Sequence, residues 1–308
     1  RLIACEGGGY GSNRRLTRTE HDGTITVLAH SYQGKRINSP NDVTIDSKGR
    51  LYFSDPRYGI RSDLEQFDDK GRAVEGVYRI DDVDKVSRIL THEVIRPNGL
   101  AISPDGKHLV SGDLYGSVRQ WSIGGWKPER ELDAKILHTR LDNFIADVGG
   151  VRSLAFNKNG NLLAVGGMKE AKSNAFCPGK PTVLIFDWAS GKQKIELRIK
   201  GKSDGPFNAL RFLEDGTLAG HTEIIHADSE LTFWKTDTPD PLHSIKNGSA
   251  YDLSLHPDGR QLLVASYVSG GSTGNGARER HREKYEPNAT NLKFFNLFAK
   301  PPDDKKTG

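Results

Sequence analysis

The chain has 308 residues, with 44 lysines and arginines against 40 aspartates and glutamates and a formal net charge of +4. Charge this close to balance indicates no nucleic-acid partner. No apolar run approaches the roughly 18 residues that a membrane helix needs, so we expect a soluble protein without a membrane partner. The compartment stays open: cytoplasmic, or periplasmic or secreted if a signal peptide precedes Arg1.

Taken in chain order, the first thirty or so residues predict three short strands, at 2–5, 15–18 and 24–28. From residue 41 onward, a hairpin pattern returns five times: an alternating apolar stretch, a glycine-containing turn and a second apolar stretch. Such turns between alternating stretches predict antiparallel hairpins. The copies begin about 40–60 residues apart, which is the period of propeller blades. The glycines that mark the five turns are Gly49, Gly106, Gly160, Gly216 and Gly259.

The strands between the hairpins complete the blades. Residues 249–298 predict three strands and no fourth, and the first segment predicts strands two to four of a blade without its innermost strand. The predicted fold class is therefore all-β: a β-propeller of about six four-stranded blades with incomplete first and last blades. The segments that each predict a complete blade are 39–92, 96–140, 149–200 and 205–246.

The incomplete end blades predict an open seam. Propellers normally close their ring by pairing the chain ends, and this chain also lacks an initial Met, so we expect an N-terminally truncated piece. An exposed sheet edge at the seam would favour self-association, although the sequence leaves the oligomeric state open. The propeller is predicted as one domain, 1–300, followed by a polar tail at 301–308.

Three stretches carry a resemblance to a known family: 34–43 (GKRINSPNDV), 52–60 (YFSDPRYGI) and 96–105 (RPNGLAISPD). They resemble the senescence-marker-protein/gluconolactonase/luciferin-regenerating-enzyme family in order and spacing. The resemblance covers about 1–110. Residues 107–300 instead resemble WD-repeat propellers, through stretches such as 109–121 and 154–167. The chain is thus interpreted as a hybrid of two kinds of blade.

The family resemblance implies a metal-dependent lactonase site at one mouth of the central channel. There a single divalent cation, calcium or zinc, would polarise a lactone carbonyl and activate water. Asn98 matches the family's metal-ligand asparagine, and Asn41 matches its substrate-contacting asparagine. The family's glutamate ligand lies on the innermost strand that the first blade lacks. Its aspartate ligand aligns with Arg152, which cannot ligate a cation, so we expect the metal site to be broken.

Alignment of the hairpins on their turn glycines brings together a set of candidate ligand-binding residues at the mouth. Arginine and asparagine side chains there would suit a small anionic or sugar-acid ligand. In the alternative interpretation, the asparagines cap the strand starts and Arg152 pairs with Asp42 or Asp252. The candidates are Asn41, Asp42, Asn98, Arg152, Asn208 and Asp252.

The cysteines and one group of histidine and glutamate residues give weaker indications of function. Cys5 and Cys177 fall in different blades and predict no disulfide. His221, Glu223 and His226 have spacings that suggest a metal, but Gly220-His221 is more typical of a WD repeat.

The predicted function is a binding or interaction scaffold with a small molecule or protein at the channel mouth and no cofactor. The alternative is a metal-dependent lactonase-type hydrolase, impaired because two family ligands are unmatched. In that case Asn98 would be the surviving metal ligand and calcium or zinc the cofactor.

Overall fold

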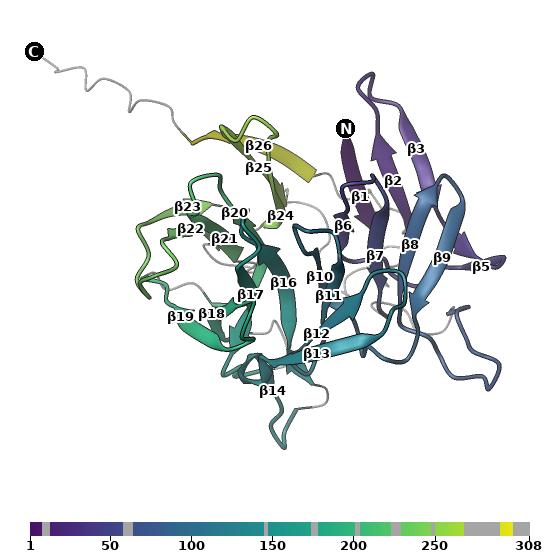
Figure 1. Cartoon of the computed structure of the whole chain (residues 1–308), viewed down its shortest axis with the longest axis horizontal. Coiled ribbons are helices and arrows are strands. Elements are labelled where there is room, and N and C mark those ends of the chain that lie inside the picture. Colours follow the sequence, from purple (N-terminus) through teal and green to yellow (C-terminus); the bar gives the residue numbers. More distant parts are fainter. Residues whose placement is uncertain are drawn as a thin grey trace, which may run out of the picture.

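The structure is a computed structural model of the whole chain (Figure 1). It describes residues 1–7, 13–57, 64–144, 147–173, 178–200, 204–222, 229–247, 250–267 and 290–297. Within these residues the chain is nearly all strand, and the helical element found is a single short 3-10 turn, η1 (Lys135–Leu137). No helix long and apolar enough to span a membrane occurs among them.

Six antiparallel sheets form the blades of a β-propeller, as the hairpin repeat predicts (Figure 1). The sheets of blades 2 to 5 each have four strands, which follow one another in chain order. Blade 2 contains β6 (Val43–Ile45), β7 (Leu51–Asp55), β8 (Gly76–Asp82) and β9 (Lys85–Leu90). Blade 3 contains β10 (Asn98–Ile102), β11 (His108–Gly112), β12 (Ser117–Ser122) and β13 (Pro128–Asp133). Blade 4 contains β16 (Val151–Phe156), β17 (Leu162–Lys169), β18 (Lys180–Asp187) and β19 (Gln193–Leu197). Blade 5 contains β20 (Phe207–Phe212), β21 (Leu218–Thr222), β22 (Ser229–Trp234) and β23 (His243–Asn247).

In the part of the chain that the structure describes, the two end blades have three strands each, as predicted. Blade 1 contains β1 (Leu2–Glu6), β2 (Arg15–Thr19) and β3 (Ile25–Ala29), and blade 6 contains β24 (Ala250–Leu255), β25 (Gln261–Tyr267) and β26 (Thr290–Asn296). Two small two-stranded sheets lie between blades: β4 (Ser31–Tyr32) with β5 (Lys35–Arg36), and β14 (His138–Thr139) with β15 (Val148–Gly149).

The five turn glycines have the conformation that the hairpins require. Their φ angles are 80° at Gly49, 69° at Gly106, 70° at Gly160, 81° at Gly216 and 69° at Gly259. This left-handed region carries little penalty for glycine and is costly for residues with a Cβ atom. The glycine of each copy therefore fixes where the innermost strand ends and where the second strand begins.

Apolar clusters join each blade to the next along the chain. Five clusters connect blades 1 and 2, 2 and 3, 3 and 4, 4 and 5, and 5 and 6. Among the described residues, no such cluster joins blade 6 to blade 1. On the outer strand of blade 6, Leu292 and Phe294 are 43% and 61% exposed. The seam between the end blades is thus the least packed part of the described ring.

Candidate functional site at the mouth of the propeller

The candidate residues lie where the innermost strands begin. These strands, β6, β10, β16, β20 and β24, follow one another around the centre of the propeller, and each contacts the next from β6 to β24 (Figure 1). We call the face of the propeller at which they begin the mouth. Five of the six predicted residues lie in the first two positions of these strands or in the two residues before them: Asn41, Asp42, Asn98, Arg152 and Asn208. Asp252 lies third in β24.

The innermost strands differ in the position of a β-bulge near their start. In β10 the register shifts between Asn98 and Leu100, so that Gly99 is the extra residue. In blades 4, 5 and 6 the extra residue falls one place earlier relative to the turn glycine and carries a side chain: Arg152, Asn208 or Tyr251. A bulge redirects the side chain at its position. Alignment of the sequence on the turn glycines therefore identifies equivalent positions. It does not show that Asn98 belongs to the hydrogen-bonded ladder, whereas Arg152, Asn208 and Tyr251 lie on bulges.

Asp42 connects the starts of two neighbouring blades. Its Oδ2 accepts a hydrogen bond from the backbone N–H of Leu100 in blade 3 at 2.6 Å, and its Oδ1 accepts one from Val43 at 2.9 Å. Burial, together with the negative charge of Asp252, raises the pKa of Asp42 to about 7, although these hydrogen bonds oppose the rise. This carboxyl group therefore changes protonation near neutral pH.

Arg211, and not Arg152, lies beside Asp252. An Arg211 nitrogen is 4.0 Å from Asp252 Oδ2, and Arg211 Nε donates to the Leu253 carbonyl at 2.9 Å. The expected pairing of Arg152 with Asp42 or Asp252 is therefore wrong. The sequence could not show this. It predicts that Asp42, Arg152 and Asp252 lie near strand starts, but it does not specify which residue of a neighbouring blade each side chain contacts.

Asn98 is buried, whereas Asn41 is exposed. The side-chain Oδ1 of Asn98 accepts from the backbone N–H of Gly99 at 3.1 Å, as the cap interpretation predicts. The backbone N–H of Asn41 donates to Ser54 at 3.0 Å, which fixes the start of blade 2 at the mouth.

Two further groups at the mouth were not among the candidate ligand-binding residues predicted from the sequence. The carboxylate of Asp55, at the end of β7, accepts the backbone N–H groups of Asn38 at 2.8 Å and Ser39 at 2.7 Å, and burial raises its pKa to about 7. Burial raises the pKa of the Cys5 thiol well above its usual range, as do the charges of Asp42, Asp252 and Asp55. The Ser54-Asp55-Pro56 motif was a usable signal for Asp55, whereas nothing in the sequence placed Cys5 near these acids.

The residues present do not fit the cation that the family resemblance implies. Asn98 is the matched ligand, the position aligned with the family's aspartate holds the cationic Arg152, and a carboxamide alone is a weak ligand. Within the described ranges, no group of three or more His, Cys, Asp or Glu side chains is arranged to hold a metal ion.

The histidine at the start of the second pattern that suggested a metal site has a structural role instead. His221 is fully buried, and its Nδ1 lies 2.7 Å from the Thr222 carbonyl oxygen, to which it donates. Its Nε2 accepts from Asn247 at 3.2 Å, and burial lowers the pKa of His221 to about 4. The ring is thus neutral and both nitrogens are occupied. Glu223 and His226 lie outside the described residues.

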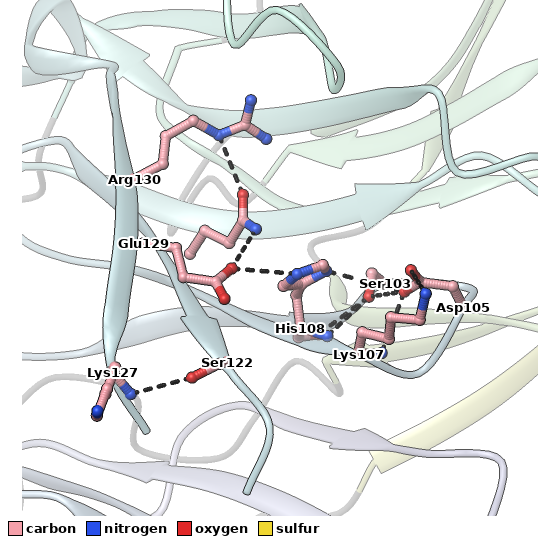
Figure 2. Close-up of polar contacts among 9 residues, drawn as sticks. Ser103, Asp105, Lys107, His108, Ser122, Lys127, Glu129 and Arg130 are labelled. Carbon is pink, nitrogen blue, oxygen red and sulfur yellow. Dashed lines mark hydrogen bonds and ion pairs between the residues drawn. The ribbon is translucent and has the colours of Figure 1, made fainter. Parts of the chain in front are cut away.

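A polar cluster away from the innermost strands ties blade 3 to blade 4. Figure 2 shows His108 between Glu129 and Asp105, with Nε2 3.1 Å from a Glu129 oxygen and Nδ1 3.8 Å from Asp105. The guanidinium of Arg130 lies over the Trp188 ring of blade 4, 4.4 Å from its centre. These contacts join outer strands and turns, so they support the scaffold rather than the mouth.

The fold and these residues define a β-propeller with a polar mouth. A family model described as the SMP-30/Gluconolactonase/LRE-like region matches residues 1–119. The match covers the part of the chain whose sequence resembles this family. It contains Asn41, Asp42 and Asn98.

Curated relatives and a solved structure are also similar to this chain. A gluconolactonase of Zymomonas mobilis subsp. mobilis is 33% identical over 145 residues, which are 45% of this chain and 39% of that protein. Protein STRICTOSIDINE SYNTHASE-LIKE 6 of Arabidopsis thaliana is 34% identical over 97 residues, 31% of this chain and 26% of its own length. The chain thus spans less than half the length of either relative. A chain in the crystal structure of the mitotic checkpoint complex is 14% identical with a TM-score of 0.55, covering 87% of this chain and 69% of that one, and shows the fold alone.

Proposed function

We propose that this propeller acts on lactones as a gluconolactonase-type hydrolase, with its reaction site on the blade 2 and blade 3 side of the mouth. The observation that carries the proposal is the position of Asn41, Asp42 and Asn98. All three lie at the mouth ends of adjacent innermost strands, within the residues that match the family model. The gluconolactonase relative supports the reaction class.

The reaction opens a cyclic ester. Water adds to the lactone carbonyl, the ring C–O bond breaks, and the ring oxygen leaves as a hydroxyl group, so that the product is a hydroxy acid. A general base works best when its pKa lies near the operating pH, and the pKa of Asp42 is about 7. We therefore assign to Asp42 the removal of the water proton, and to Asn41 a contact with the lactone.

We further propose that the reaction does not use a tightly bound divalent cation. The guanidinium of Arg152 stands at the position of the family's acidic ligand. A fixed positive charge there opposes a second one, because unit charges several ångströms apart still repel appreciably at an intermediate dielectric constant.

A binding propeller without turnover is the second candidate function. Arg152 favours this function, because the hydrolysis steps described above assign no role to this cationic hydrogen-bond donor. Such a protein would hold a small molecule or protein at the mouth and release it unchanged.

Hydrolysis of glucono-δ-lactone by the purified chain, followed by pH-stat titration, tests the proposal. We expect turnover that persists after chelation of divalent cations and that is lost in Asp42→Asn. Calorimetry with calcium, zinc and manganese should show no tight binding. Metal binding that disappears in Asn98→Ala, together with metal-dependent turnover, would contradict the metal-free proposal. Absence of turnover by any lactone would leave the binding propeller.

A further inference from the structure

Blades 4, 5 and 6 present the same kind of position at the mouth. Each innermost strand has its bulge at the residue aligned with Asn98, which is Arg152 in β16, Asn208 in β20 and Tyr251 in β24. The residue before each bulge is buried: Val151, Phe207 and Ala250 are at most 2% exposed. Arg152 and Asn208 are half-buried, and Tyr251 is 46% exposed.

These three side chains therefore lie at equivalent positions of their blades and are less buried than the residues that precede them. The strands that carry them are neighbours: β16 contacts β20, and β20 contacts β24 (Figure 1). We call Arg152, Asn208 and Tyr251 the mouth arc. Blade 3 does not contribute to it, because its bulge falls on Gly99.

Arg152 is the charged member of the mouth arc, and its Nε is buried without a hydrogen-bond partner in the described part of the chain. A guanidinium is always protonated and has donors only, so it requires acceptors. The acids that the sequence suggested are engaged elsewhere. Asp42 accepts from Leu100 and Val43, and Asp252 lies beside Arg211. A buried donor of this kind calls for an acceptor that none of the described residues supplies.

We propose that the mouth arc binds a carboxylate, and that its ligand is a polyhydroxy acid. The planar fork of Arg152 matches the two oxygens of a carboxylate. The amide of Asn208 suits a hydroxyl group, because it both donates and accepts, and the half-exposed Tyr251 ring offers an apolar face and a phenolic O–H.

This inference deepens the proposed function. Opening of a lactone creates a carboxylate, so the arc on blades 4 to 6 would hold the product acid, while blades 2 and 3 carry the reactive groups. The identity of the ligand as the opened lactone rests on the proposed hydrolysis. The carboxylate site itself rests on Arg152 and holds with or without turnover.

Calorimetric titration of the whole chain with gluconate, and with neutral glucitol as the matched polyol, tests the site. We expect millimolar or tighter binding of gluconate, and binding of glucitol at least about tenfold weaker. Arg152→Gln should weaken gluconate binding at least about tenfold, the scale of a lost charge-assisted pair. Arg152→Lys should retain part of it, since it keeps the charge without the fork. Arg72→Gln, at an exposed arginine paired with Asp68, is the control and should bind as the wild type does.

Salt provides a readout that does not depend on the folding of a variant. Gluconate binding to the wild type should weaken as ionic strength rises, and glucitol binding should not. Equal binding of gluconate and glucitol, binding unchanged in Arg152→Gln, or no gluconate binding at millimolar concentration would each overturn the inference. Lactone turnover without gluconate binding would support the proposed hydrolase and contradict the carboxylate site. Gluconate binding without turnover would support the carboxylate site and contradict the hydrolase.

Discussion

Blades 2 and 3 and blades 4 to 6 build the mouth in different ways from the same hairpin. In the first pair the mouth residues tie the backbone together: Asp42 crosses to the N–H of Leu100, and Asn98 caps Gly99. In the second group, the bulge gives the corresponding position to a projecting side chain, such as Arg152. A one-residue difference in the bulge thus separates a buried amide from a half-buried cation, although both occupy one place in the repeat.

The division between the two regions follows the family match, which ends at residue 119, within blade 3. The interpretation of 107–300 as WD-repeat-like stays a prediction, since solved structures at this level of identity show the fold alone. A shared repeat thus fixes the place of a side chain in the blade, while the local register decides whether that side chain belongs to the ladder or to a bulge.

The largest expected effect is on lactone hydrolysis, from a substitution in blade 2, which we propose carries the general base. Asp42→Asn should lower lactone hydrolysis by about 100-fold or more, the usual scale for loss of a general base. In the wild type, activity should rise with pH through about 7, because the base must be deprotonated. Rates and a pH profile from pH-stat assays check both statements.

Asp46→Asn is the matched control for this substitution. Asp46 accepts hydrogen bonds in the turn after β6, at the end of the strand opposite the mouth, so the change should lower stability and leave hydrolysis in place. Equal losses of activity in the two variants would show that Asp42 acts through folding alone.

The next effect concerns the stability of the mouth in blade 2. Asp55→Asn leaves one oxygen to accept two buried N–H groups, those of Asn38 and Ser39. The free energy of unfolding should fall by about 1–3 kcal/mol, the cost of one unsatisfied buried donor. Urea unfolding followed by tryptophan fluorescence measures it.

The pH dependence of that difference has a definite sign. Burial raises the pKa of Asp55 to about 7 in the folded protein, whereas an unfolded aspartate titrates near about 3.9. Between these values the folded state holds a proton that the unfolded state has released, so the wild type loses stability as pH rises through this window. Its advantage over Asp55→Asn should be largest below about pH 4 and shrink towards pH 7. An advantage that grows with pH over this range would show the sign to be wrong.

A smaller effect tests the bulge that distinguishes blade 3. In Gly99→Ala the new methyl group would lie 3.1 Å from Val151 Cγ1 and 3.2 Å from Leu154 Cγ, at a φ of +38°. We expect a loss of about 1–2 kcal/mol, from backbone strain and packing against blade 4. Gly216→Ala is the control, since its φ is +81° and nothing lies within 4 Å. If both variants lose the same stability in thermal unfolding, the close approach of blade 4 has no cost.

How far the sequence predicts this molecule depends on the range of the interaction. Turn glycines and alternation are local, so they predict the blades, the three-stranded ends and the near absence of helix correctly in the described residues. The bulge at Arg152 and the pairing of Asp252 with Arg211 depend on the neighbouring strand, which no local pattern specifies. Ligand binding by the predicted mouth residues stays a prediction, because their positions alone do not demonstrate it.

The smallest expected effect is at the seam. Leu292 and Phe294 are exposed on β26, whose outer edge has no paired strand among the described residues. Such an edge favours strand addition from another molecule. Size-exclusion chromatography over a range of concentrations should show self-association that Phe294→Ser reduces. A monomer at every concentration would mean that this edge is protected.

Gluconate binding by the Asp42→Asn variant tests the central claim most directly, because it asks whether reaction and acid binding belong to different blades. The account predicts a protein that has lost hydrolysis and still binds gluconate with the wild-type affinity, within about twofold. Loss of gluconate binding together with hydrolysis, in a variant that unfolds at the wild-type temperature, would contradict it.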